Sequence, residues 1–133
     1  MKRFLLWVCV PFLLWSCSSQ ADRTQNAFYA DMVKAQTALA DVQSLVKSSK
    51  FAKVRYTERV NRMIPVAQQE LKKYQNSPQA AEPAYRHLKK SFEHYVMADH
   101  LWKQDKGLVM VNQRLADAEK ALQRGGDALK ELK

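Results

Sequence analysis

The sequence predicts an all-α fold, an antiparallel up-down-up-down four-helix bundle. Apolar residues recur at spacings of three and four along four segments of similar length, which is the pattern of helices with one buried face. Turns of a few residues separate these segments, as between antiparallel neighbours, and no segment alternates like a strand. A chain of 133 residues, 47% of them hydrophobic and 26% charged, is sufficient for one domain with a modest core.

Residues 1–16 have the pattern of an export signal. Lys2 and Arg3 precede an uncharged apolar run over residues 4–15. This run has 12 residues, whereas a membrane-spanning helix needs roughly 20, and Pro11 interrupts it. We therefore expect a signal peptide that is removed and not a permanent membrane span.

The apolar run ends in Leu14-Trp15-Ser16-Cys17, which resembles the lipobox of bacterial lipoproteins, although Trp15 replaces the usual small or aliphatic residue. The resemblance implies cleavage before Cys17 and acyl chains on its thiol and amine, and several chains make a durable membrane anchor. Ser18 stands where an Asp would resemble the inner-membrane retention signal. The resemblance thus implies the periplasmic face of the outer membrane, with the inner membrane as the alternative. The other interpretation is an ordinary secretory signal with an incidental cysteine.

Cysteine usage limits the chemistry of the mature chain. Cys9, in the predicted signal, and Cys17 are the only cysteines. No other thiol is left for a disulfide, a thiolate metal site or a cysteine nucleophile. Cleavage before Cys17 would leave 117 residues with a net charge of +7.

The mature chain is expected to begin with a tether over residues 17–25, because residues 18–25 are polar and lack periodicity. Fully extended, those eight residues reach at most about 28 Å. The bundle domain is expected over residues 26–133, with its first helix at about 26–48. We call the row of residues expected to face the core the seam of a helix. The seam of this helix consists of Phe28, Met32, Ala35, Leu39, Val42 and Val46.

The second helix is predicted at about 51–75, between the weak break at residues 48–50 and the stop signal at residues 76–78. Its seam consists of Tyr56, Val60, Ile64, Ala67, Leu71 and Tyr74. Pro65 lies inside this helix and lacks a backbone N–H. We therefore expect a kink near residues 61–65, or a split of the helix there.

The third helix is predicted at about 80–104, and the fourth begins after the turn at residues 104–107. The third seam consists of Tyr85, Leu88, Phe92, Tyr95, Asp99 and Trp102. The fourth consists of Leu108, Val111, Leu115, Ala118, Leu122, Leu129 and Leu132. Gly125 and Gly126 each cost a helix roughly 1 kcal/mol relative to Ala, so the last turn or two are expected to fray.

Asp99 is the anomalous residue of these seams, because its spacing places a carboxylate beside Tyr95 and Trp102. A buried carboxylate needs a partner or a raised pKa, and such groups often mark functional pockets. One interpretation is a small polar pocket formed by these three residues. The other is a hydrated residue at the rim of the bundle, paired with a Lys or Arg.

Positive charge concentrates between Lys47 and Lys73, a segment with a net charge of +6. Arg55, Arg59 and Arg62 follow one another at helical spacing and form what we call the arginine face. Together with Lys73 they are candidates for binding anionic phospholipid, lipopolysaccharide or an acidic envelope protein. Nucleic acid is not expected as a partner of an exported protein. The alternative is a solvated face with an ion pair between Glu58 and Arg62.

Three histidines, His87, His94 and His100, lie on the third predicted helix. His87 and His94 are about 10.5 Å apart along the helix axis, and His94 and His100 point to different sides, so no two can bind one ion. The chain also lacks a Cys-x-x-Cys-His motif for haem, although Met32 lies on a seam. We expect surface histidines, no metal, no cofactor and no catalytic residue, because no nucleophile has an identifiable base.

These observations favour a membrane-anchored periplasmic lipoprotein that acts as a non-enzymatic interaction or scaffold module. Its layout resembles that of the pilotins, small lipoproteins of secretion systems. The alternative function is a small-molecule sensor or ligand-binding bundle that uses Tyr95, Asp99 and Trp102.

Overall fold

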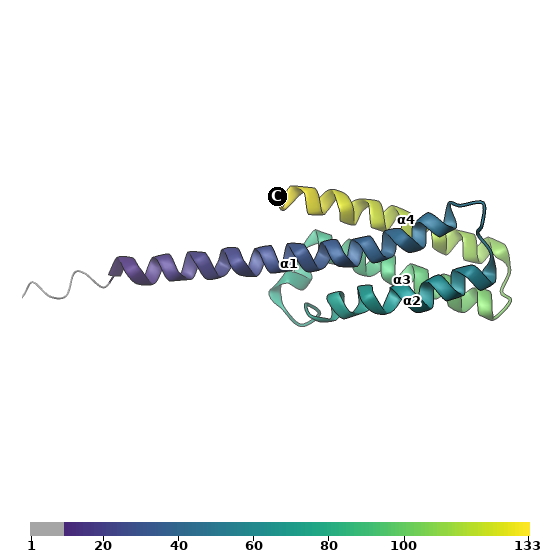
Figure 1. Cartoon of the computed structure of the whole chain (residues 1–133), viewed down its shortest axis with the longest axis horizontal. Coiled ribbons are helices and arrows are strands. Elements are labelled where there is room, and N and C mark those ends of the chain that lie inside the picture. Colours follow the sequence, from purple (N-terminus) through teal and green to yellow (C-terminus); the bar gives the residue numbers. More distant parts are fainter. Residues whose placement is uncertain (1–9) are drawn as a thin grey trace, which may run out of the picture.

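The computed structural model describes residues 10–133, with side chains from residue 20 onward, and shows a helical bundle (Figure 1). The four α-helices are α1 (Val10–Val46), α2 (Lys53–Lys72), α3 (Pro83–Lys103) and α4 (Leu108–Glu131), and a 3₁₀ helix, η1 (Pro78–Ala81), lies between α2 and α3. Successive helices run in opposite directions, and no strand occurs over residues 10–133. The predicted all-α bundle is confirmed.

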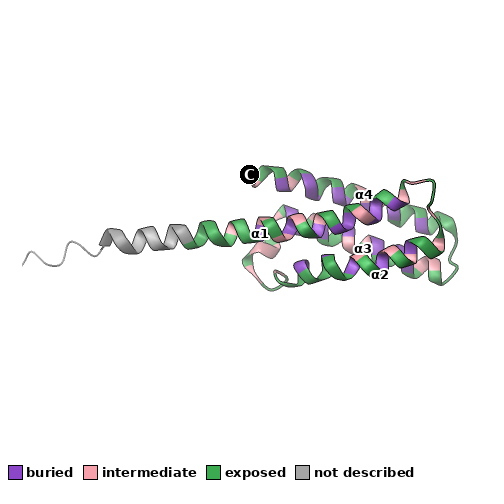
Figure 2. Cartoon of the chain, in the orientation of Figure 1, coloured by how far each residue is buried: buried purple, intermediate pink, exposed green. Residues whose placement is uncertain are grey.

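The first helix is longer than predicted and projects from one end of the bundle (Figures 1 and 2). It begins at Val10, not near residue 26, so the expected tether over residues 18–25 is helical. Residues 20–27 are almost all exposed, and burial begins at Phe28. Once packing has fixed the inner part of a helix, each added residue extends it without a new nucleus, which explains how a polar segment remains helical. None of the described helices is both long enough and apolar enough to span a membrane.

The predicted seams form one continuous core (Figure 2). Among its largest completely buried side chains are Tyr56, Tyr95, Phe28, Met32, Leu39 and Leu88. Five predicted seam residues are only half-buried: Val46, Tyr74, Trp102 and Leu132 near the helix ends, and Phe92 in the middle of α3. Leu108 is the one apolar seam residue that was assigned wrongly, because as the first residue of α4 it lies beyond the packed part of the bundle and is 59% exposed.

The two prolines inside the predicted helices have different effects. α2 runs unbroken through Pro65, so the predicted split does not occur. Pro65 and Asn61, whose carbonyl loses its helical donor, are both exposed, and water can supply the missing hydrogen bond. Pro83, in contrast, starts α3 three residues later than predicted. Proline suits the first position of a helix and forces the preceding residue, Glu82, into an extended conformation.

The paired glycines of α4 do not end the helix, so the expected fraying is wrong. Both are buried, and α4 continues to Glu131. A Cβ at Gly125 would lie 2.8 Å from Leu88 Cδ2 of α3, and one at Gly126 would lie 2.6 Å from Gln36 Nε2 of α1. The glycines therefore allow α4 to approach both neighbours closely, and this close packing offsets their low helix propensity.

A pair of substitutions separates this packing effect from helix propensity. Both Gly125→Ala and Gly126→Ala gain about 1 kcal/mol of helix propensity. Only Gly125→Ala places a methyl group against a fully buried side chain, Leu88, whereas Gln36 can move aside. We expect Gly125→Ala to be less stable than Gly126→Ala by about 1–3 kcal/mol, measured by urea denaturation. Equal free energies of unfolding would contradict a close approach at Gly125.

Candidate functional site

The predicted lipidation site falls outside the residues whose side chains the structure describes. Residues 1–9 of the predicted signal lie outside the description altogether. Leu14 to Cys17 belong to the first turns of α1, where only the backbone helix is described. Lipidation of Cys17 therefore stays a prediction.

The arginine face lies on one side of α2, and its three members differ in their contacts. With Leu45, Lys50 and Glu58 they line a surface hollow of about 460 Å³. Arg59 is held by α1, because its Nη1 lies 3.1 Å from Asp41 Oδ2 and donates a hydrogen bond to the Asp41 carbonyl. Arg55 and Arg62 are exposed and form no ion pair with any described residue, so the expected pair between Glu58 and Arg62 is absent there. Two of the three arginines thus remain available to an anionic partner.

Lys73, the fourth cation assigned to this surface, lies in a local network of acids. Its Nζ is 3.3 Å from Asp31 Oδ1 and also contacts the carboxylate of the buried Glu70. The Tyr74 hydroxyl donates a 2.6 Å hydrogen bond to Asp31. Burial opposes ionisation of Asp31, but the hydrogen bonds from Tyr74 and Lys73 outweigh it and lower the pKa of the carboxyl. Lys73 therefore joins α1 to α2, and two carboxylates balance its charge.

The polar groups of Asp99 and Tyr95, in the candidate polar pocket, already have partners within the bundle. Asp99 is buried and accepts a 2.9 Å hydrogen bond from Thr57. It also forms an ion pair with Lys103, whose Nζ lies 2.6 Å from Asp99 Oδ2. The Tyr95 hydroxyl donates to Gln43 Oε1 of α1. Asp99 is thus paired with a lysine, as in the second interpretation, although it is buried more deeply than a rim residue.

Trp102, the third residue of that candidate pocket, belongs to an aromatic cluster. Its ring centroid lies 5.1 Å from that of Phe51 and 5.8 Å from that of Tyr56. These contacts close the seam between α2 and α3 at the end of the bundle opposite the projecting part of α1 (Figure 1).

The histidines do not form a metal site among the residues described. His100 is exposed, whereas His87 and His94 are half-buried. Within the described part of the chain, no three His, Cys, Asp or Glu side chains gather around a common point. Met32, which was considered as a residue near a haem, is completely buried in the hydrophobic core of the bundle.

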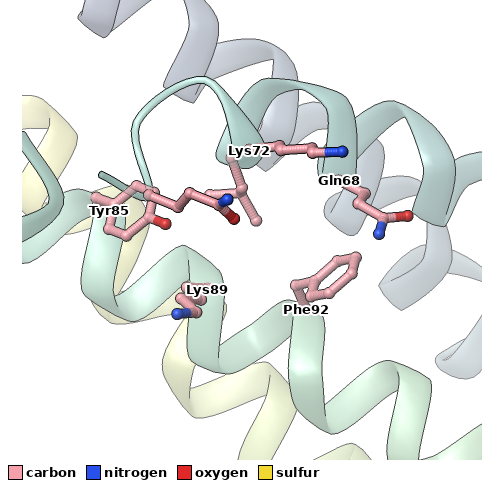
Figure 3. A pocket seen from close by; sticks show the side chains of 7 residues that line it. Gln68, Lys72, Tyr85, Lys89 and Phe92 are labelled. Atoms are coloured by element: carbon pink, nitrogen blue, oxygen red, sulfur yellow. The ribbon is translucent and has the colours of Figure 1, made fainter. Parts of the chain in front are cut away.

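A basic groove between α2 and α3 was not predicted from the sequence (Figure 3). We define the α2–α3 groove by the residues that line its two adjoining hollows, of about 190 and 310 Å³. These residues are Gln68, Leu71, Lys72, Gln75, Ala80, Tyr85, Arg86, Lys89, Lys90, Phe92 and Glu93. The two hollows share Gln75, Tyr85 and Lys89, so they form one depression.

The sequence contained only a weak sign of this groove. The cations that line it lie on different helices, Lys72 on α2 and Arg86, Lys89 and Lys90 on α3. Their proximity depends on the antiparallel pairing of α2 with α3, and a charge count along the chain cannot reveal it.

Comparison of the chain with protein-family models, curated proteins and solved structures finds no match.

The Asp31 network gives a pH-dependent prediction. Asp31→Asn should lower the free energy of unfolding at pH 7 by about 1–3 kcal/mol, because the charge-assisted hydrogen bonds are lost. The lowered pKa of Asp31 means that its ionised form stabilises the fold above the unfolded-state pKa of about 3.9. This stabilisation is lost as the pH falls through the lower, folded value. The difference between wild type and variant should therefore shrink between about pH 5 and pH 2.

Urea denaturation followed by circular dichroism at several pH values measures this difference. Asp127→Asn is the matched control, because Asp127 is exposed and, among the described residues, pairs only with Lys130 three residues away. Its effect should stay within about 0.5 kcal/mol at every pH. A pH-independent effect of Asp31→Asn would contradict the assigned network.

Proposed function

We propose that this protein is a lipid-anchored periplasmic lipoprotein whose bundle is a non-enzymatic interaction module. In this proposal, acyl chains on Cys17 hold it at the periplasmic face of the outer membrane, and the arginine face binds an acidic envelope protein. The alternative, a ligand-binding bundle built on Tyr95, Asp99 and Trp102, has less support, because the polar groups of the first two are already hydrogen-bonded within the bundle.

The observation that carries the proposal is the projecting part of α1. It connects the predicted lipidation site to the bundle through a continuous helix (Figure 1). From Cys17 to Phe28, where burial begins, the helix rises by about 16 Å. A helix of this length acts as a stiff spacer, whereas the expected flexible tether would let the bundle turn freely. A spacer of this kind suits a module that presents one surface to a partner.

The position of the arginine face favours a protein partner over the lipids of the anchoring membrane. Arg55 lies in the first turn of α2, at the end of the bundle opposite the projecting helix. Measured along α1, that end is roughly 40 Å from Cys17. At physiological salt, charges are screened over about 8 Å. With α1 standing upright on the membrane, the headgroups beneath it are too far away to attract these arginines.

The lipid anchor is tested by mass spectrometry of the protein isolated from membranes. We expect a mature N-terminus at Cys17 that carries diacylglyceryl and acyl groups, and Cys17→Ser should abolish both cleavage and lipidation. Cys9→Ser is the control, because Cys9 lies inside the predicted signal and should not affect either step. An unmodified Cys17 or a different N-terminus would contradict the proposal.

The arginine face is tested by lysine-directed crosslinking in intact cells, followed by the same experiment in isolated membranes. Arg55→Glu with Arg62→Glu should reduce a discrete protein adduct at least tenfold. Arg59 is left unchanged, because it pairs with Asp41. In isolated membranes the adduct should weaken between about 0.05 and 0.5 M salt, since screening increases.

The matched control is Arg114→Glu with Lys120→Glu, which makes the same charge change on exposed residues of α4. The adduct should survive in this control. If it also survives in the Arg55 and Arg62 variant, the arginine face is a solvated surface. Flotation of the variants with phosphatidylglycerol vesicles separates lipid binding from protein binding.

A further inference from the structure

The α2–α3 groove combines an apolar floor with cationic walls. Leu71 and Tyr85 are buried and Phe92 is half-buried, and these three side chains form the floor. Lys72 on α2 and Lys89 on α3 are exposed on its two sides (Figure 3). Ligand pockets typically combine an apolar lining with a few charged or polar groups, and cations in that role match a ligand with an anionic group.

The hydroxyl of Tyr85 is an unused donor in this groove. Tyr85 is only 3% exposed, yet its hydroxyl forms no hydrogen bond with any described residue. Within the described part of the chain, every fully buried polar side-chain atom has a partner, so the Tyr85 oxygen must be open to the groove. Figure 3 shows this hydroxyl directed into the space between α2 and α3. The other buried tyrosines, Tyr56 and Tyr95, both donate to partners inside the bundle.

The cations of the groove are not balanced by acids of the bundle. Lys72, Lys89, Arg86 and Lys90 form no ion pair with any described residue, and Glu93 is the single acid in the lining. Their neighbour Lys73, in contrast, contacts two carboxylates. Four cations against one acid leave a net positive charge around the depression, and its potential attracts anions.

His87 lies on the same helix as three of these cations. Burial, together with the charges of Arg124, Lys90 and Arg86, lowers the pKa of the imidazole. Two of these three charges, Lys90 and Arg86, belong to the groove, and Arg124 lies on α4.

We propose that the α2–α3 groove binds an organic anion, namely a carboxylate or phosphate attached to an aromatic or short aliphatic group. The apolar group lies on Leu71 and Phe92, the anionic group lies between Lys72 and Lys89, and Tyr85 donates a hydrogen bond to it. The two hollows, of about 190 and 310 Å³, together fall within the range of small-ligand sites, about 300–1,000 Å³, so the groove suits a small organic anion of one or two rings. This site is independent of the arginine face and of the lipid anchor.

Photolabelling with 4-benzoylbenzoate, an aromatic carboxylate, tests the proposal on the full-length chain in phosphatidylcholine nanodiscs. Peptide mass spectrometry should locate the label on α2 and α3 residues of the groove. The uncharged amide, 4-benzoylbenzamide, should label these residues at least tenfold less. Competition with excess benzoate or phenyl phosphate then identifies which anionic group the site prefers.

Substitutions identify the residues responsible. Lys72→Gln with Lys89→Gln should reduce groove labelling at least tenfold, and Tyr85→Phe, which keeps the ring, should reduce it about threefold. Lys34→Gln with Lys120→Gln is the matched control, because both lysines are exposed and, like the groove lysines, form no ion pair with a described residue. Circular dichroism verifies that each variant is folded.

The proposal is overturned if the carboxylate and the amide label the groove equally, or if the groove lysine variant labels like its control. Label that falls mainly outside the residues that line the α2–α3 groove would also overturn it. None of these results depends on Cys17 or on Arg55 and Arg62, so the outcome is distinguishable from failure of the proposed function.

Discussion

The hydroxyl groups of two fully buried tyrosines fix the positions of three helices. Tyr56 of α2 donates a 2.8 Å hydrogen bond to the carbonyl of Tyr95 in α3, and the Tyr95 hydroxyl donates to Gln43 of α1. Burial raises the pKa of both phenols, so they remain neutral donors at physiological pH. A buried hydroxyl without a partner costs about 1–3 kcal/mol, and a shift of any of these helices along its axis would break at least one bond.

The shape of the seam between α2 and α3 follows from this constraint. At the end of the seam near Tyr56, aromatic packing with Phe51 and Trp102 closes it, and Asp99 of α3 accepts a hydrogen bond from Thr57 of α2. At the other end, near η1, exposed side chains that border the seam are long and polar, among them Gln68, Lys72 and Lys89. The same pair of helices is therefore sealed at one end and open at the other, where the α2–α3 groove lies.

Cations of α2 and of its C-cap, Lys73, look equivalent along the chain but have different surroundings in the fold. Arg59 and Lys73 bond to acids of α1 and help to hold that helix against α2. Arg55 and Arg62 have no acidic partner among the described residues, and Lys72 borders the groove. The groove lies near the end from which α1 projects, whereas the arginine face begins at the opposite end. A protein partner and a small anion would therefore bind without competing.

The sequence by itself determined the helical class, the seams and the turns, because each depends on local spacing and on residues such as Pro78 and Gly107. It also suggested the lipid anchor, which rests on Leu14 to Cys17 and on no tertiary contact. Only the tertiary structure shows why α4 continues through Gly125. The missing side chain lets α4 approach Leu88 of another helix closely. Likewise, the partners of Asp99 and Lys73 and the groove at Tyr85 arise from residues distant in the chain, which become neighbours only when the helices pack.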